Sequence, residues 1–225
     1  MPQKTDEKTR LLALTKIEKQ ARKKGFQAIA GIDEAGRGPL AGPVVAAACM
    51  IPAGLLFEGI NDSKQLTPLK RERLFTALTS HPDVLYGVGQ AETEEIDTIN
   101  IYQATLLAMR RALDALKRLP DYLLVDGMTI DYRGIACQKV VGGDAKVHMI
   151  AAASVIAKET RDRLMRDYHK IYPDYGFDEH KGYGVPKHMA ALQKHGPCPL
   201  HRKSFAPVSA LLISPEQGLN AHRFY

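Results

Sequence analysis

Cysteine is scarce in this chain of 225 residues: Cys49, Cys137 and Cys198 form no CxxC pair and no even-numbered framework. We therefore expect reduced thiols and a cytoplasmic protein, not a disulfide-stabilised secreted domain. Long apolar runs are lacking as well. The longest, Val44–Ile51, is far too short to span a bilayer, and the charged N-terminus has no signal-peptide core. We expect no membrane partner.

Positive charge is concentrated at one end of the chain. The net charge is +6, and residues 1–24 carry eight Lys and Arg against three Asp and Glu, which gives +5 and leaves +1 for the rest. A nearly neutral body with a basic arm suits salt-sensitive contact with a phosphate backbone, although modest basicity is also common in proteins that bind no nucleic acid. Hydrophobic residues make up 45% of the chain, which is typical of a globular domain.

Apolar periodicity predicts alternating strands and helices. We predict helices at 4–24, 68–80, 93–119, 146–169 and 186–194, and strands at 27–33, 43–51, 84–91, 122–125 and 134–140. The first two strands and the last two are too close in sequence for a crossover helix, so each pair is either a hairpin or is joined by an irregular loop. The pattern predicts a mixed α/β sheet with helices on its faces.

Acidic residues stand at successive ends of these elements. Asp33 and Glu34 close the first strand, Asp126 closes the fourth, and Asp144 precedes the long helix. Buried carboxylates need partners, and several of them at the strand ends of a sheet would bind a hard cation such as Mg²⁺ or Mn²⁺. Other interpretations stay open: Asp144 suits a helix cap, Asp126 suits a turn, and adjacent strand residues such as Asp33 and Glu34 normally face opposite sides.

The chemistry expected of such a site would be in-line attack of water on a phosphodiester, in which two cations would activate the water and stabilise the leaving 3′-oxygen. No protein nucleophile is then required. Ser154 stands in no nucleophile elbow, and the cysteines have no evident base beside them. His148, in an apolar helical run, is predicted to be a hydrogen-bonded core histidine. The sequence also lacks a Walker-type phosphate loop, which argues against a small-molecule phosphatase or kinase-like enzyme.

A Gly-Arg-Gly turn follows the first acids, and alone it would indicate only an ordinary turn. The whole run from Gly31 to Val45, GIDEAGRGPLAGPVV, resembles the opening motif of ribonuclease HII, the type 2 ribonuclease H family. Further motifs match in order at 61–64 (NDSK), 124–127 (LVDG), 143–144 (GD), 153–158 (ASVIAK), 180–184 (HKGYG) and 201–205 (HRKSF). The resemblance covers about residues 26–208.

The resemblance implies an α/β fold of the ribonuclease H-like type: a five-stranded mixed sheet flanked by helices, with a small C-terminal helical region. It divides the chain into a basic N-terminal helical extension (1–25), a catalytic core (26–172) and a C-terminal substrate-binding region and tail (173–225). It also implies that Asp33, Glu34, Asp126 and Asp144 bind Mn²⁺ or Mg²⁺, with two ions during catalysis. Asp144 is then a ligand, whether or not it also caps the helix.

Substrate contacts are implied in the same way. The backbone of Gly36, Arg37 and Gly38 senses the 2′-hydroxyl that distinguishes RNA from DNA. Tyr183 packs on the neighbouring deoxyribose, where a ribose would fit worse, and its two flanking glycines make it a poor core residue because their backbone is loose. Five further side chains either position phosphates or merely face solvent. They are Ser63, Lys64, Lys181, Arg202 and Ser204.

We therefore predict a monomeric endoribonuclease that removes misincorporated ribonucleotides from DNA by cutting on their 5′ side, and that also degrades RNA in RNA/DNA hybrids. It would leave 3′-hydroxyl and 5′-phosphate ends. Ribonuclease HIII shares this chemistry but usually has a larger N-terminal domain and a different glycine turn. A non-catalytic nucleic-acid-binding module on this fold would lack one of the four acids, and all four are present.

Two segments lie outside the resemblance. The basic N-terminal helix either adds DNA affinity or packs on the fold. The terminal segment Gln217–Tyr225 fits a sliding-clamp peptide poorly, so an ordinary tail is the favoured interpretation.

Overall fold

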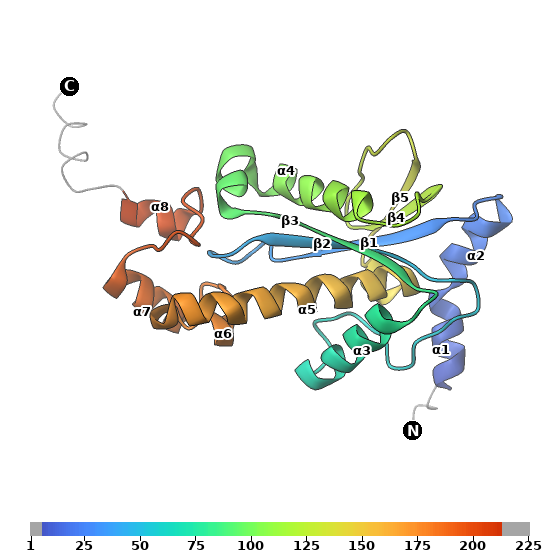
Figure 1. Cartoon of the computed structure of the whole chain (residues 1–225), viewed down its shortest axis with the longest axis horizontal. Coiled ribbons are helices and arrows are strands. Elements are labelled where there is room, and N and C mark those ends of the chain that lie inside the picture. Colours follow the sequence, from blue (N-terminus) through green and yellow to red (C-terminus); the bar gives the residue numbers. More distant parts are fainter. Residues whose placement is uncertain (1–5, 213–225) are drawn as a thin grey trace. The chain divides into compact units, whose positions relative to one another are not determined.

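The computed structural model describes residues 6–212, and its centre is a five-stranded sheet with the strand order β3-β2-β1-β4-β5 (Figure 1). β1 runs antiparallel to β2 and parallel to β4, and β4 runs parallel to β5. The prediction of a mixed sheet is thereby confirmed. The strands are β1 (Ile29–Ala35), β2 (Val44–Met50), β3 (Leu85–Ala91), β4 (Tyr122–Asp126) and β5 (Ala136–Val140).

The two close strand pairs differ in how they are joined. β1 and β2 are antiparallel neighbours, so they form a hairpin across residues 36–43. β4 and β5 are parallel, so a hairpin is wrong for them and the irregular loop 127–135 makes the connection. All seven residues of β2 are buried, which is typical of a strand covered on both faces of the sheet.

The chain divides into two compact units. We call residues 6–35, 45–90 and 105–160 the sheet unit, and residues 36–44, 91–104 and 161–212 the second unit. Both units contain stretches from distant parts of the sequence, so they do not follow chain order. The predicted functional boundaries at residues 25 and 172 stay predictions.

Helices cover both faces of the sheet within the sheet unit. Figure 1 shows the end of α4 (Thr93–Asp114) over one face, and the beginning of α5 (His148–Ile171) with α3 (Pro68–Ser80) over the other. Gly31 of β1 allows α5 to approach, because a Cβ atom there would lie 2.3 Å from the backbone carbon of Met149. A glycine at this point therefore fixes the spacing between the central strand and the helix.

The N-terminal segment packs on the sheet unit as two helices, α1 (Glu7–Leu14) and α2 (Lys16–Lys23). The prediction of one continuous helix is wrong, because the chain breaks at Thr15, whose side chain donates a hydrogen bond back to the carbonyl of Leu12. Leu11 and Leu14 are buried in the main core cluster. Packing on the fold is therefore shown for the described part of this segment, and an added affinity for DNA stays a prediction.

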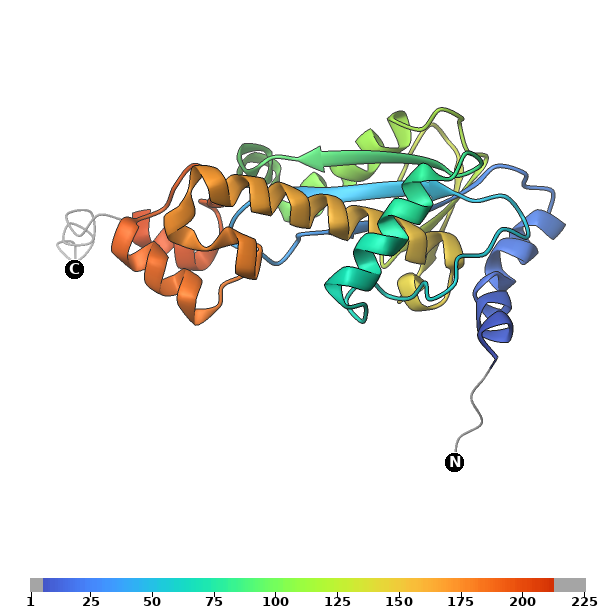
Figure 2. The same cartoon turned by 60° about the horizontal axis from the view of Figure 1, so that its bottom comes forward.

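The second unit has its own core. Figure 2 shows the end of α5 gathered with the short helices of the C-terminal part of the chain. Met165, Phe177 and Leu192 are fully buried there, together with Leu40 and Ala41 from the segment between β1 and β2. These helices are α6 (Phe177–His180), α7 (Pro186–His195) and α8 (Ala206–Leu212), which bears out the expected C-terminal helical region.

Helix ends are where the sequence predictions were least accurate. α4 ends at Asp114, five residues before the predicted end, and it is interrupted at Asn100, whose φ of 67° is left-handed. The side chain of Asn100 accepts hydrogen bonds from the amides of Tyr102 and Gln103, so it caps a second helical segment. The short helices α6 and α8 were not predicted. Within residues 6–212, no helix has the length and apolar character needed to cross a membrane.

Candidate active site

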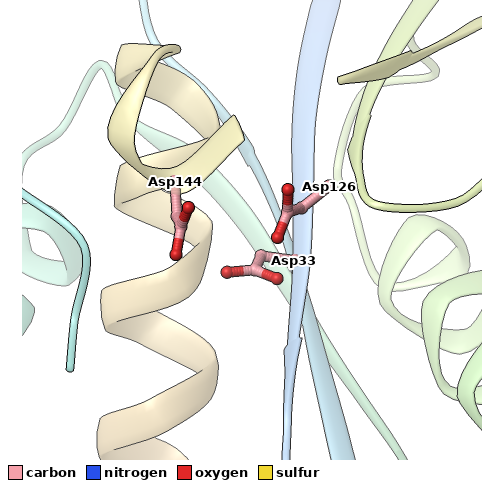
Figure 3. Close-up of side chains that lie close together, drawn as sticks. All are labelled: Asp33, Asp126 and Asp144. Carbon is pink, nitrogen blue, oxygen red and sulfur yellow. The ribbon is translucent and has the colours of Figure 1, made fainter. Parts of the chain in front are cut away.

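Three carboxylates meet in the sheet unit. Asp33, Asp126 and Asp144 each offer a carboxylate oxygen, and these oxygens lie within 4.8 Å of one another (Figure 3). β1 and β4 are parallel, with Ile32 beside Val125, so the next residue along each strand is one of these aspartates. The sheet register therefore places Asp33 and Asp126 side by side, and the structure brings Asp144 close to both; their role as metal ligands stays a prediction.

Burial and mutual repulsion raise the pKa values of two carboxyl groups in the cluster, Asp33 and Asp144. Asp33 is 5% exposed, and burial, followed by repulsion from Glu34 and Asp126, raises its pKa well above the usual value. Burial also raises the pKa of Asp144, with further contributions from Asp62 and Asp126. Such a group is stable in its charged form only with a cation nearby.

The donor set fits a hard divalent cation. Mg²⁺ and Mn²⁺ prefer oxygen ligands, and oxygens on opposite sides of a Mg²⁺ ion lie about 4.2 Å apart. Three carboxylate oxygens within 4.8 Å of one another approach that dimension. The three aspartates therefore have both the chemistry and the spacing to hold a metal ion.

Glu34 occupies a different place from the other predicted ligands. It follows Asp33 on β1, its amide donates a 2.7 Å hydrogen bond to the Asp33 carboxylate, and its side chain is half-buried. It does not belong to the group of three found among the described residues, as expected for an adjacent strand residue. The charge of Glu34 nevertheless raises the pKa of Asp33, which shows that the two carboxylates interact. A role for Glu34 as a fourth ligand stays a prediction.

The loop that contains the NDSK motif also faces this cluster. Ser63 is 3% exposed, and its hydroxyl lies 2.8 Å from that of Ser154, which hydrogen-bonds to Asp33. Burial would lower the pKa of Lys64, but the charges of Asp62, Asp33 and the other aspartates outweigh it and raise that pKa. Ser63 therefore supports a carboxylate, and Lys64 supplies positive charge to the cluster.

Sequence reasoning missed two residues of this site. Asp62 was quoted only as part of a motif, although its charge acts on both Asp144 and Lys64. Ser154 was quoted within the motif ASVIAK and rejected as a nucleophile, whereas its hydroxyl hydrogen-bonds to Asp33. The motif NDSK held the signal for Asp62, since it is an acid in a polar loop; no local signal pointed from Ser154 to Asp33.

The turn after β1 belongs to the second unit and is held by two buried arginines. Arg161 donates to the carbonyls of Ala41, Pro43 and Lys181 over 2.9–3.0 Å. A Cβ atom on Gly36, where φ is +96°, would lie 2.0 Å from the Arg161 side chain. The first glycine of the turn is therefore required both by its backbone conformation and by this close contact.

Arg202 holds the same turn from its other side. It is 0% exposed and donates to the carbonyls of Gly36, Arg37 and Gly42 over 2.5–3.0 Å. Burial, followed by the charge of Arg161, lowers its pKa to about 9. These contacts give Arg202 an internal structural role, and a direct phosphate contact, as predicted from the sequence, stays a prediction.

Tyr183 lies beside the glycine turn. A Cβ atom on Gly38 would be 3.6 Å from Cε1 of the tyrosine ring, and the side chain of Tyr183 is 43% exposed. The prediction that its flanking glycines have a loose backbone is wrong for Gly182. A Cβ atom on Gly182 would lie 2.5 Å from the carbonyl oxygen of Ala41, so this backbone is tightly packed. The turn and the tyrosine therefore form one exposed surface within the second unit.

The other predicted phosphate contacts already have hydrogen bonds in the protein. The Ser204 hydroxyl and amide both donate to Asp97 of α4, over 2.6 Å and 2.9 Å. The Lys181 ammonium donates to the carbonyl of Asp178. His148, by contrast, was predicted to be a core histidine, and this is confirmed: it is 1% exposed and accepts a hydrogen bond from the amide of Phe57.

The fold and this cluster define a class, namely nucleases of the ribonuclease H-like type that use carboxylate-bound metal ions. A family model described as Ribonuclease HII matches residues 30–208. A protein named Ribonuclease HII from Chlamydia caviae is 53% identical over 203 residues, which is 90% of this chain and 95% of that protein. A second, from Chlamydia muridarum, is 56% identical over 192 residues, 85% of this chain and 88% of that protein. The chain belongs to the ribonuclease HII family.

Solved structures agree with this assignment. The ribonuclease H2 from Pyrococcus horikoshii OT3 is 28% identical with a TM-score of 0.69, and covers 82% of this chain and 97% of its own. Two further structures share the fold. The RNase HII of a PCNA complex from Archaeoglobus fulgidus is 23% identical with a TM-score of 0.62, and the match covers 80% of this chain and 95% of that one. Bst-RNase HIII in complex with Mn²⁺ is 19% identical with a TM-score of 0.61, and the match covers 85% of this chain and 71% of that one. The chain is a ribonuclease H hydrolase, and the ribonuclease HIII alternative is not favoured.

Proposed function

We propose that this ribonuclease hydrolyses the phosphodiester on the 5′ side of a ribonucleotide in duplex DNA, and the RNA strand of RNA/DNA hybrids, leaving 3′-hydroxyl and 5′-phosphate ends. The single observation that carries the chemistry is the meeting of three carboxylates, Asp33, Asp126 and Asp144. A hydrolase of this type needs no protein nucleophile. The selection of a ribonucleotide rests on the turn at residues 36–38 and on Tyr183.

The aspartates would hold Mg²⁺ or Mn²⁺, with Glu34 joining them when metal binds. Two such ions supply an activated water and stabilise the charge of the leaving 3′-oxygen. Asp33 is oriented for this task by hydrogen bonds from the Ser154 hydroxyl and the Glu34 amide. Lys64 supplies a positive charge in the field of these carboxylates, where it can offset the negative charge of the approaching phosphate.

Substrate selection would fall to the second unit. The backbone of the turn at 36–38 meets the 2′-hydroxyl, and Tyr183 packs on the next sugar, which must be a deoxyribose. Arg161 and Arg202 hold the turn and the Lys181–Tyr183 segment in one shape. We propose that Arg202 acts through this turn, and that Ser204 and Lys181 support the same surface.

The proposal extends to the metal, the oligomeric state and the cellular role. The metal is Mn²⁺ or Mg²⁺, the former being the ion bound to the Bst-RNase HIII structure. We propose a monomer that acts in the cytoplasm to remove ribonucleotides during DNA replication and repair. The Archaeoglobus fulgidus RNase HII was solved in a complex with PCNA, and the segment Gln217–Tyr225 that would make a sliding-clamp contact in this chain lies outside the described residues.

The test is an endonuclease assay on a labelled DNA duplex with one ribonucleotide, compared with an all-DNA duplex and with added chelator. We expect one metal-dependent cut on the 5′ side of the ribonucleotide. Asp33→Asn should fold and bind the duplex but lose more than about 100-fold in rate, the upper range for groups that merely orient a ligand. The matched control is Asp131→Asn, an exposed carboxylate outside the cluster. Near wild-type cleavage by Asp33→Asn would refute the metal assignment.

A further inference from the structure

Histidines of the second unit gather behind Tyr183. His188 and His201 are 0% and 1% exposed, and their Nε2 atoms lie 3.0 Å apart. The ring of His180 stacks on that of His188 with centroids 4.5 Å apart. The proposed reaction uses none of these side chains, so their burial needs another explanation.

The hydrogen bonds of the pair fix where each proton lies. The amide of Cys198 donates to Nδ1 of His201 over 2.9 Å, and a contact of 3.3 Å to the Cys198 carbonyl is longer. A neutral His201 therefore carries its proton on Nε2 and donates it to His188. Nε2 of His188 must then be an acceptor, so its proton is on Nδ1.

That last proton is directed at Tyr183. Nδ1 of His188 lies 2.9 Å from the carbonyl oxygen of Tyr183, which completes a chain of three hydrogen bonds from Cys198 to the tyrosine backbone. On the other side, the amide of Tyr183 donates to the carbonyl of His180 over 3.0 Å. Histidine residues therefore contact both polar groups of the Tyr183 backbone, and the carbonyl also accepts a hydrogen bond from the amide of Val185 over 2.9 Å.

The chain of bonds requires neutral histidines. Burial lowers the pKa of His201 to about 4, with a contribution from His188, and burial followed by the charge of His180 lowers that of His188. A proton added to either ring would leave two donors facing each other at 3.0 Å. At neutral pH the pair therefore keeps one arrangement, and only that arrangement donates to Tyr183.

We propose that His188, set in one tautomer by His201, is a positioning residue that holds the Tyr183 ring beside the glycine turn for recognition of the RNA-to-DNA junction. The inference rests on the proposed role of Tyr183. It adds that the histidines select for single ribonucleotides without touching the substrate.

Two amide substitutions at His188 test its two hydrogen bonds separately, the one to Tyr183 and the one from His201. In His188→Asn the side-chain NH₂ can take the place of Nδ1–H and donate to Tyr183. In His188→Gln the side-chain oxygen can take the place of Nε2 and accept from His201, but the donor to Tyr183 is lost. Both variants replace the buried imidazole ring with a neutral side-chain amide. If the role of His188 were only to fill space, both variants should lose similar amounts of activity.

The measurement is the ratio of kcat/KM for a duplex with one ribonucleotide to kcat/KM for a long RNA/DNA hybrid, at pH 7.5 with Mg²⁺. We expect His188→Gln to lower this ratio by up to about tenfold, the effect of one hydrogen bond, and His188→Asn to retain most of it. Tyr183→Ala should lower the ratio too, and adding His188→Gln to it should cause no further loss. Equal ratios for the two amide variants, or additive losses, would overturn the proposal.

A second measurement needs no substrate and no variant. ¹⁵N NMR of the full-length protein should show His188 as the Nδ1–H tautomer and His201 as the Nε2–H tautomer; the reverse assignment overturns the proposal even if the variants fail to fold. If the wild-type protein cuts neither substrate, the proposed function fails instead. If it prefers single ribonucleotides and His188→Gln keeps that preference, only the positioning role fails.

Discussion

Replacing Arg202 with lysine separates two roles that the same charge could have. A phosphate contact needs a positive charge on a flexible stem, and lysine provides it. The internal role needs a planar fork, because Arg202 donates to the carbonyls of Gly36, Arg37 and Gly42 at once. Arg202→Lys therefore keeps the charge and removes the fork.

The magnitude follows from those carbonyls. An ammonium group at the end of a lysine cannot reach three carbonyls in the fork geometry, so at least one buried oxygen loses its donor, at a cost of about 1–3 kcal/mol. The pKa of Arg202 is already lowered to about 9 by burial and by Arg161, and a lysine at this position would lose its proton more easily. We expect a loss of about 2–4 kcal/mol in the free energy of unfolding, or roughly 5–15 °C in Tm.

The assay combines urea unfolding with cleavage of a single-ribonucleotide duplex at several salt concentrations. We expect Arg202→Lys to lose stability and selectivity while the salt dependence of binding stays unchanged. The matched control is Arg73→Lys, an exposed arginine on α3, which should change neither. A variant with wild-type stability and selectivity would refute the internal role and favour a phosphate contact, which a lysine can also make.

Three further predictions concern buried groups. Burial raises the pKa of Glu18 to about 7, so folding becomes less favourable as pH rises from about 4.5 to 7. We expect Glu18→Gln to be more stable than the wild type by up to about 3 kcal/mol at pH 8 and to differ little from it at pH 4.5. Urea unfolding at both pH values measures this difference. Burial is the main cause that lowers the pKa values of His148 and His201 to about 4. The free energy of unfolding should therefore fall by up to about 2–3 kcal/mol for each histidine as pH drops from 6.5 to 4. The fall should be smaller in His148→Gln than in the wild type. Gly36→Ala should destabilise the turn against Arg161 by more than about 1 kcal/mol and abolish the preference for ribonucleotides, whereas cleavage with wild-type preference would contradict the close contact.

The parts of the site that follow from strand order could be predicted. Asp33 and Asp126 stand at the ends of strands that the apolar pattern marks clearly, and parallel pairing brings such ends together. The place of Glu34 could not be settled in this way. The alternation of strand side chains argued against a shared metal, the resemblance argued for it, and the structure keeps Glu34 outside the group of three.

The internal arginines show a limit of another kind. Arg161 and Arg202 are among the largest fully buried side chains of the described chain, and their guanidinium groups bind carbonyls, not acids. A charged residue in a sequence is far more often exposed, so a surface role was the natural expectation. Only the path of the backbone, which turns six carbonyl groups toward these two side chains, makes an internal role possible.

The two interpretations of Asp144 are separated by a residue far away in the sequence. α5 begins at His148, and Asp144 lies before it in the 3-10 turn Gly143–Ala145. The amide of Met149, in the first turn of α5, donates instead to Glu18 of α2 over 2.8 Å. The Asp144 carboxylate accepts from the amide of Ala145 over 3.0 Å, so Glu18, and not Asp144, caps the first turn of α5 at Met149. The Asp144 carboxylate lies near those of Asp33 and Asp126, and the N-terminal segment contributes to the site by capping the helix that follows this third aspartate.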